Sequence, residues 1–80
     1  MKLKKNDYFI IVDDGYEKED KINGSVGIFI GKAEDFMYSY EGKLLMVKNN
    51  KSVYKEGYSY FFDMKEIRKI TKEEAFLELL

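Results

Sequence analysis

Few side chains in this sequence suit catalysis, because it contains no histidine and no cysteine. Those residue types supply the commonest general base and the strongest nucleophile of enzymes. Serine and threonine remain, and none of them lies in a nucleophile-elbow pattern such as GxSxG. The sequence therefore predicts a protein that is not an enzyme, and it excludes disulfides and thiolate metal sites.

Carboxylates are concentrated in the segment 13–20. Gathered carboxylates can bind a hard cation such as Ca²⁺, which takes about six to eight oxygen ligands, but their spacing differs from that of an EF-hand loop. A solvated loop explains the same residues. If they have a role, we expect attraction of a basic partner rather than metal binding, and no cofactor is predicted. The residues are Asp13, Asp14, Glu17, Glu19 and Asp20.

Aromatic side chains are the more informative group. The 7 tyrosines and 6 phenylalanines exceed what the core of an 80-residue chain can absorb, and tyrosine is well suited to interfaces. We assign Phe9, Phe29 and Phe62 to the core. The other rings either cover the ends of a sheet or anchor a partner. The predicted partner-binding set joins loop rings with loop acids: Tyr16, Glu17, Glu19, Asp20, Phe36, Tyr38, Tyr40, Tyr54 and Tyr58.

Lysines interleave with two of these tyrosines between residues 40 and 55. Stacking rings beside cations are typical of single-stranded nucleic-acid binders. The overall net charge of -1 argues against a general nucleic-acid binder. The charge is uneven, since 13–35 holds seven acidic against three basic residues and 36–62 two against four. A nucleic-acid site remains the alternative, and its lysines are Lys43, Lys48, Lys51 and Lys55.

The chain is organised around residues 23–33, where Val26, Ile28 and Ile30 alternate with glycines. This pattern predicts a half-buried strand that bends or lies close to another backbone. The continuous apolar run 8–12 predicts a central strand buried on both faces. A long polar excursion, 13–24, joins the two. A single domain, 1–80, fits this length.

Further elements follow along the chain. Residues 36–40 form an edge strand or an aromatic loop, Gly42 ends it, and 43–48 form a strand followed by a turn at 49–52. The return arm is 53–63, then one helical turn at 63–66 and a closing strand at 67–70. A capping box at Thr71 predicts a helix over about 72–80, which docks on the sheet or awaits a partner. The predicted core comprises Val12, Val26, Ile28, Ile30, Leu45, Val47 and Ile67.

The stretches IIVDDGYEKEDKINGSVGIFIG and YSYFFDMKEIRKI resemble the layout of an SH3-like barrel. The resemblance covers residues 7–70 and implies a mainly β, five- to six-stranded SH3-like barrel with a short C-terminal helix. The chain has no tryptophan, unlike peptide-binding SH3 domains, so proline-rich ligands are not expected.

The stretches DYFIIVDDGY and YFFDMKEIRKIT also resemble small proteins of bacteriophages and mobile elements of low-GC bacteria. That resemblance implies a host-directed factor, such as an inhibitor of a bacterial defence system. We therefore expect a non-catalytic protein-interaction module whose partner has a basic surface. The alternative is a single-stranded nucleic-acid-binding accessory protein. No segment suits a membrane span or a secretory signal, so we expect a soluble, cytoplasmic monomer.

Overall fold

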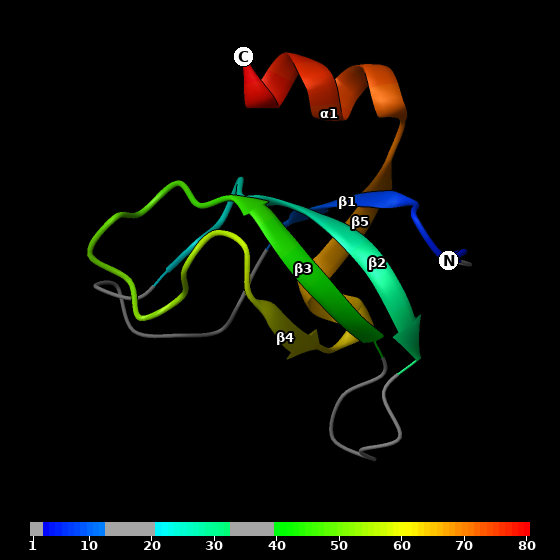
Figure 1. Cartoon of the computed structure of the whole chain (residues 1–80), viewed down its shortest axis with the longest axis horizontal. Coiled ribbons are helices and arrows are strands. Elements are labelled where there is room, and N and C mark those ends of the chain that lie inside the picture. The colour runs from blue at the N-terminus through cyan, green and yellow to red at the C-terminus, as the bar shows by residue number, and fades with distance from the viewer. Residues whose placement is uncertain (1–2, 13–20, 33–39) are drawn as a thin grey trace.

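The computed structural model describes residues 3–12, 21–32 and 40–80, and within them five strands form a single antiparallel sheet. The strand order is β4-β3-β2-β1-β5, and a short helix, α1, follows β5 (Figure 1). The mainly β class with a C-terminal helix is thus confirmed. The bounds are β1 Tyr8–Ile11, β2 Val26–Lys32, β3 Tyr40–Met46, β4 Ser59–Phe62, β5 Ile67–Ile70 and α1 Lys72–Leu79.

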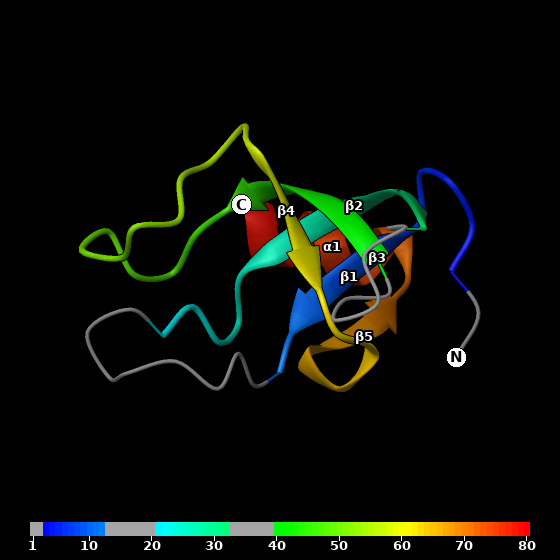
Figure 2. The same cartoon turned by 90° about the horizontal axis from the view of Figure 1, so that it is seen from below.

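The sheet curls, so that β4 crosses in front of β1 and β2 while α1 lies behind them (Figure 2). Each side of the sheet has its own apolar cluster. The main cluster lies on the β4 side and comprises Phe9, Ile11, Ile22, Phe29, Tyr40, Leu44, Phe62 and Ile67. The helix-side cluster comprises Val26, Ile70 and Ala75. The predicted core positions of Phe9, Phe29 and Phe62 are therefore confirmed.

β1 packs against an apolar cluster on each face, but the predicted burial is complete only for Phe9 and Ile11, and Tyr8 and Ile10 are half-buried. Phe9 and Ile11 belong to the main cluster, whereas Tyr8 and Ile10 pack against the helix-side cluster. The predicted burial of Val12 is wrong, because this side chain is 43% exposed just beyond the strand. Alternation of side chains along a strand accounts for the division of β1 between two clusters.

The glycines of β2 and β3 make room for one ring. A β-carbon built on Gly42 would lie 2.5 Å from ring atoms of Phe9, and one built on Gly27 would also overlap that ring. The sequence led us to expect that β2 bends or lies close to another backbone at its glycines; at Gly27 the close neighbour is instead the side-chain ring of Phe9. The sequence suggested that Gly42 ends a strand, but β3 continues through it. The absence of a side chain at both glycines leaves room for the Phe9 ring.

The predicted inward face of β2 is partly wrong. Val26 is fully buried, but Ile28 is half-buried and Ile30 is exposed. Register shifts between Val26 and Gly27 and between Phe29 and Gly31 interrupt the pairing with β3. Phe29 instead enters the main cluster, and the helix-side cluster lies near the Val26 end.

The connection from β3 to β4 is longer than the predicted hairpin. β3 ends at Met46 and β4 begins at Ser59, so the predicted strand over 43–48 is too late and the return arm over 53–63 starts too early. The chain rejoins the sheet through Gly57, whose φ of 87° favours glycine. Its amide donates to the Leu44 carbonyl, at 2.7 Å. Of the remaining predicted core, Ile67 is buried, while Leu45 and Val47 are half-buried.

The C-terminal elements were predicted correctly. Asp63 caps a 3₁₀ turn, Met64–Glu66, which leads into β5. At the start of α1, the amide of Glu74 donates to Thr71 Oγ1 and the amide of Thr71 donates to Glu74 Oε1, each at 3.1 Å. The bond from the Thr71 amide lowers the pKa of the Glu74 carboxyl below its ordinary value of 4.5.

α1 docks on the sheet, which decides between the two expectations for it. Ala75 is completely buried against Val26 and Ile70. The Phe76 ring meets the Tyr8 ring edge-on, with centroids 6.1 Å apart. No helix in the described residues is both long and apolar enough to span a membrane.

Candidate functional site

The connection between β3 and β4 forms the candidate site, because it contains a cavity, three of the predicted lysines and two of the predicted tyrosines. Its first half is an asparagine turn. The amide of Lys51 donates to Asn49 Oδ1 at 3.0 Å, and the amide of Ser52 donates to the Asn49 carbonyl at 3.1 Å. The Ser52 side chain is buried and its Oγ accepts from the Tyr54 amide at 3.2 Å. Asparagine and serine side chains thus fix the backbone of a segment that has no strand pairing.

The second half of the connection is tied to the sheet by aromatic side chains. The rings of Tyr54 and Tyr60 meet edge-on, with centroids 4.7 Å apart, and both pack against the main cluster. The amide of Lys55 donates to the Tyr60 hydroxyl at 2.9 Å. The amide of Val47 donates to Glu56 Oε1 at 3.3 Å, linking the two ends of the loop. These contacts tie the loop to β4 and join its two ends.

A cavity of about 340 Å³ lies within this connection. It is open to solvent and combines an apolar wall, a tyrosine, two side-chain amides and one charge of each sign. Such a volume lies at the lower end of the range of about 300–1,000 Å³ for small-molecule sites. The lining residues are Val47, Asn49, Asn50, Tyr54, Lys55 and Glu56.

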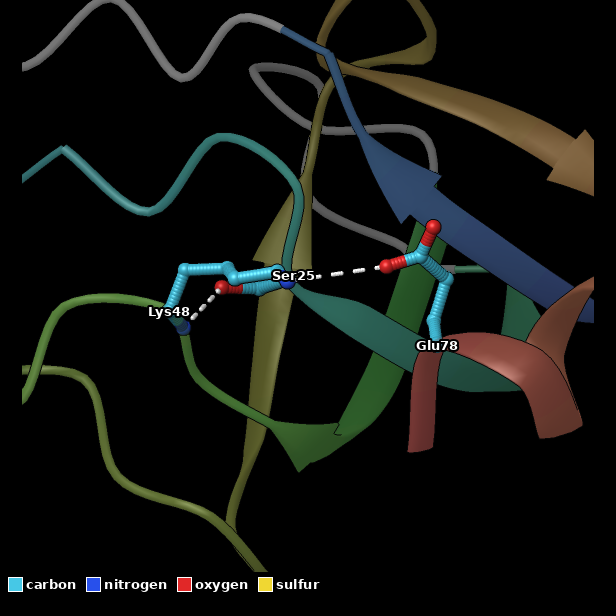
Figure 3. A network of polar contacts seen from close by, with 3 residues as sticks. All are labelled: Ser25, Lys48 and Glu78. Atoms are coloured by element: carbon cyan, nitrogen blue, oxygen red, sulfur yellow. Dashed lines mark hydrogen bonds and ion pairs between the residues drawn. The ribbon is translucent and has the colours of Figure 1, made fainter. Parts of the chain in front are cut away.

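Lys48 is not directed to this cavity, although the sequence grouped it with the other lysines. Its Nζ lies 3.5 Å from Glu78 Oε2 of α1, and its amide donates to Ser25 Oγ at 2.9 Å (Figure 3). Ser25 is completely buried. Lys48 therefore connects the loop to α1. The other two lysines of the loop, Lys51 and Lys55, are exposed on its surface.

The predicted partner-binding residues have different environments. Tyr40 is buried, its ring packing edge-on against Phe29 with centroids 5.2 Å apart. Tyr54 is half-buried beside the cavity, and Tyr58 is 65% exposed. Of the predicted tyrosines that the structure describes, Tyr58 thus has the accessible ring. Six others lie outside the described residues: Tyr16, Glu17, Glu19, Asp20, Phe36 and Tyr38.

Sequence reasoning missed several surface residues. Asn49 and Asn50 were assigned only to a turn, yet both line the cavity. Val53, Phe61 and Met64 are exposed apolar side chains on either side of Tyr58 along the chain. Turn chemistry gave no signal of a cavity, because its walls come from residues up to nine positions apart.

Electrostatic features outside the cavity serve the fold. Asp7 Oδ2 accepts from the Lys4 amide at 2.8 Å and lies 3.3 Å from Lys69 Nζ. The Lys4 amide, together with Lys69, lowers the pKa of the Asp7 carboxyl below its ordinary value of 3.8. Among the described residues no cluster of three or more acidic side chains could hold a metal ion. The acids predicted to attract a basic partner at 13–20 lie outside that part of the chain.

Comparison of the chain with protein-family models, with curated proteins and with solved structures finds no match.

Proposed function

We propose that the protein is a non-catalytic protein-interaction module built on a small SH3-like barrel. The strand order β4-β3-β2-β1-β5 supports this fold, as does the 3₁₀ turn Met64–Glu66 between β4 and β5. The absence of histidine and cysteine supports a non-catalytic role. The function of such a fold resides in its surface, so the choice of surface carries the proposal.

The observation that carries it is the run of exposed apolar side chains along residues 53–64. Val53 is 71% exposed and Tyr58 is 65% exposed, and Phe61 and Met64 follow. Large rings and flexible thioethers that remain exposed on a small domain are typical of interaction surfaces. Tyr58 is the anchor, because its ring combines a large apolar area with a polar tip.

The partner is a protein with a basic surface. Acidic residues of the segment 13–20 would attract it, while Tyr58 would supply buried contact area. The resemblance to phage and mobile-element proteins implies that this partner belongs to the host, for example to a bacterial defence system. Inhibition would then consist of covering a surface that the host protein needs.

Affinity capture tests the proposal, with the full chain immobilised and exposed to lysate of the cells in which it is naturally expressed. We expect a bound protein that resists nuclease treatment. Tyr58→Ala should weaken its binding about 30-fold, corresponding to about 2 kcal/mol for an interface hot spot. Leu77→Ala is the matched control, because Leu77 is 72% exposed on α1, on the other side of the sheet (Figure 1).

Recovery of nuclease-sensitive material alone would contradict the protein-interaction function. Equal recovery by both variants would remove Tyr58 from the interface. A second candidate, binding of single-stranded nucleic acid, is favoured by a separate observation, the cavity in the β3–β4 connection.

A further inference from the structure

We propose that the cavity in the β3–β4 connection binds one nucleotide of a single-stranded nucleic acid. This proposal does not rest on the protein-interaction function, since Tyr58 is not among the residues that line the cavity. The cavity of about 340 Å³ is large enough for one base with part of its sugar, and it is open at the surface so that a chain can continue on either side.

The lining provides a face for a base. Val47 and the Tyr54 ring contribute apolar surface, and stacking on an aromatic ring is the common way in which proteins hold single-stranded bases. The Tyr54 ring is fixed by its edge-on contact with Tyr60. A ring already held in place loses little conformational entropy when a ligand packs on it.

The lining also provides groups for the edge of a base. A side-chain amide carries a donor and an acceptor side by side, which matches the paired donor and acceptor of base edges. Within the part of the chain that the structure describes, the Asn50 amide has no hydrogen-bond partner, and it borders the cavity. Asn50 is exposed, so a ligand would displace water there rather than a hydrogen bond within the protein.

One lysine, Lys55, lines the cavity, and a second, Lys51, is exposed in the same loop. The segment 47–56 holds three lysines against one glutamate. Lys48 is paired with Glu78, and Glu56 keeps its negative charge in the lining while it accepts from the Val47 amide. Lys51 and Lys55 are therefore the cations that can contact phosphates, consistent with a ligand that is both planar and anionic.

An acidic peptide would also be attracted to these lysines, and its backbone could bond the Asn50 amide, but a nucleotide carries a stacking ring, a polar edge and an anion in one unit. The combination of stacking surface, amide and two lysines favours a nucleotide. Of the lysines that the sequence grouped together, Lys48 is excluded from this site, because its Nζ pairs with Glu78 of α1.

Fluorescence anisotropy tests the proposal, with a labelled oligothymidylate of about ten nucleotides, a length within the usual site sizes, and the full chain. We expect binding that weakens steeply as salt rises. The double variant Lys51→Gln with Lys55→Gln should reduce the magnitude of the slope of the logarithm of the binding constant against the logarithm of the salt concentration by about 1.4. This reduction corresponds to a loss of about 25-fold in affinity at about 0.1 M salt. Asn50→Ala should weaken binding about fivefold through loss of a hydrogen bond.

The matched control is the double variant Lys5→Gln with Lys32→Gln, which removes the same charge at the opposite end of β2. Both lysines are exposed. Lys32 pairs with Tyr40 at the start of β3, whereas the cavity lies in the connection that follows Met46 at its end. Lys5 precedes Asn6, whose amide donates to the Phe29 carbonyl of β2. This control should keep its affinity within about twofold. Circular dichroism and the melting temperature of each variant establish that it is folded.

Three results would overturn the proposal. Absence of oligonucleotide binding at millimolar protein would exclude the site. An equal loss in the cavity and control variants would indicate general charge attraction. Displacement of the oligonucleotide by an acidic peptide as effectively as by thymidine monophosphate would assign the surface to anionic peptides instead.

Discussion

The two faces of the sheet are built in contrasting ways. The main cluster draws side chains from all five strands and from Ile22, so its residues are far apart in the sequence. The helix-side cluster rests on three buried residues, one each from β2, β5 and α1. The first face depends on the fit of rings over glycines, whereas the second depends on a short helix with its own cap. We therefore expect the first face to decide whether the domain folds. The second face should make a smaller contribution to the free energy of unfolding.

The largest expected effect is that of Phe9→Ala. The Phe9 ring is 1% exposed, and its loss would leave a cavity over Gly27 and Gly42. We expect a cost of about 3–5 kcal/mol, enough to unfold most small domains. Urea denaturation followed by circular dichroism measures it. Phe76→Ala removes a half-exposed ring from the helix side and should cost about 1 kcal/mol; equal losses would abolish the contrast between the faces.

Gly42→Ala should have the next largest effect. Its β-carbon would lie 2.5 Å from the Phe9 ring, and overpacking of this kind costs about 1–3 kcal/mol. Gly31→Ala is the control in β2, because its β-carbon would meet nothing within 4 Å. Thermal unfolding of the two variants should separate them. A stable Gly42→Ala protein would mean that the Phe9 ring does not lie over β3.

Thr71→Ala tests the helix side with a smaller expected change. Loss of the bond from the Glu74 amide should cost about 1 kcal/mol. Since α1 is docked, this loss should appear in the unfolding free energy of the whole domain. Thr71→Ser keeps the hydroxyl and should remain close to the original stability. If neither variant changes the unfolding midpoint, α1 does not contribute to global stability.

The smallest effect concerns acid. The pKa of Glu74 is lowered in the folded chain, so its bonds stabilise the fold at neutral pH. That contribution is lost as the pH falls below the ordinary value of 4.5 and through the folded-state pKa. Urea midpoints measured from pH 6 to about pH 3 should fall less steeply for Glu74→Gln than for the original chain. Parallel curves would show that Glu74 titrates alike in the folded and unfolded states.

Local signals in the sequence determined the elements whose chemistry lies within a few residues. The capping box at Thr71 acts over three residues, so the start of α1 was predicted to the residue, and the 3₁₀ turn and β5 were also predicted almost to the residue. The apolar run of β1 and the burial of Phe9, Phe29 and Phe62 followed from composition and patterning. The lysines beside the cavity were also identified from the sequence.

Tertiary structure decided what depends on distant partners. Tertiary packing decided how deeply the predicted face of β2 is buried: Val26 lies in the helix-side cluster, whereas Ile30 on the same face is exposed. The sequence suggests that Gly42 ends a strand, whereas in the structure it makes room for the Phe9 ring of β1. The cavity arises because Gly57 returns the chain to Leu44 later than a tight hairpin would. The Lys48 side chain forms an ion pair with Glu78, 30 residues further along the chain, rather than contributing to the cavity. These outcomes are packing choices between residues far apart in the sequence, and no local pattern encodes them.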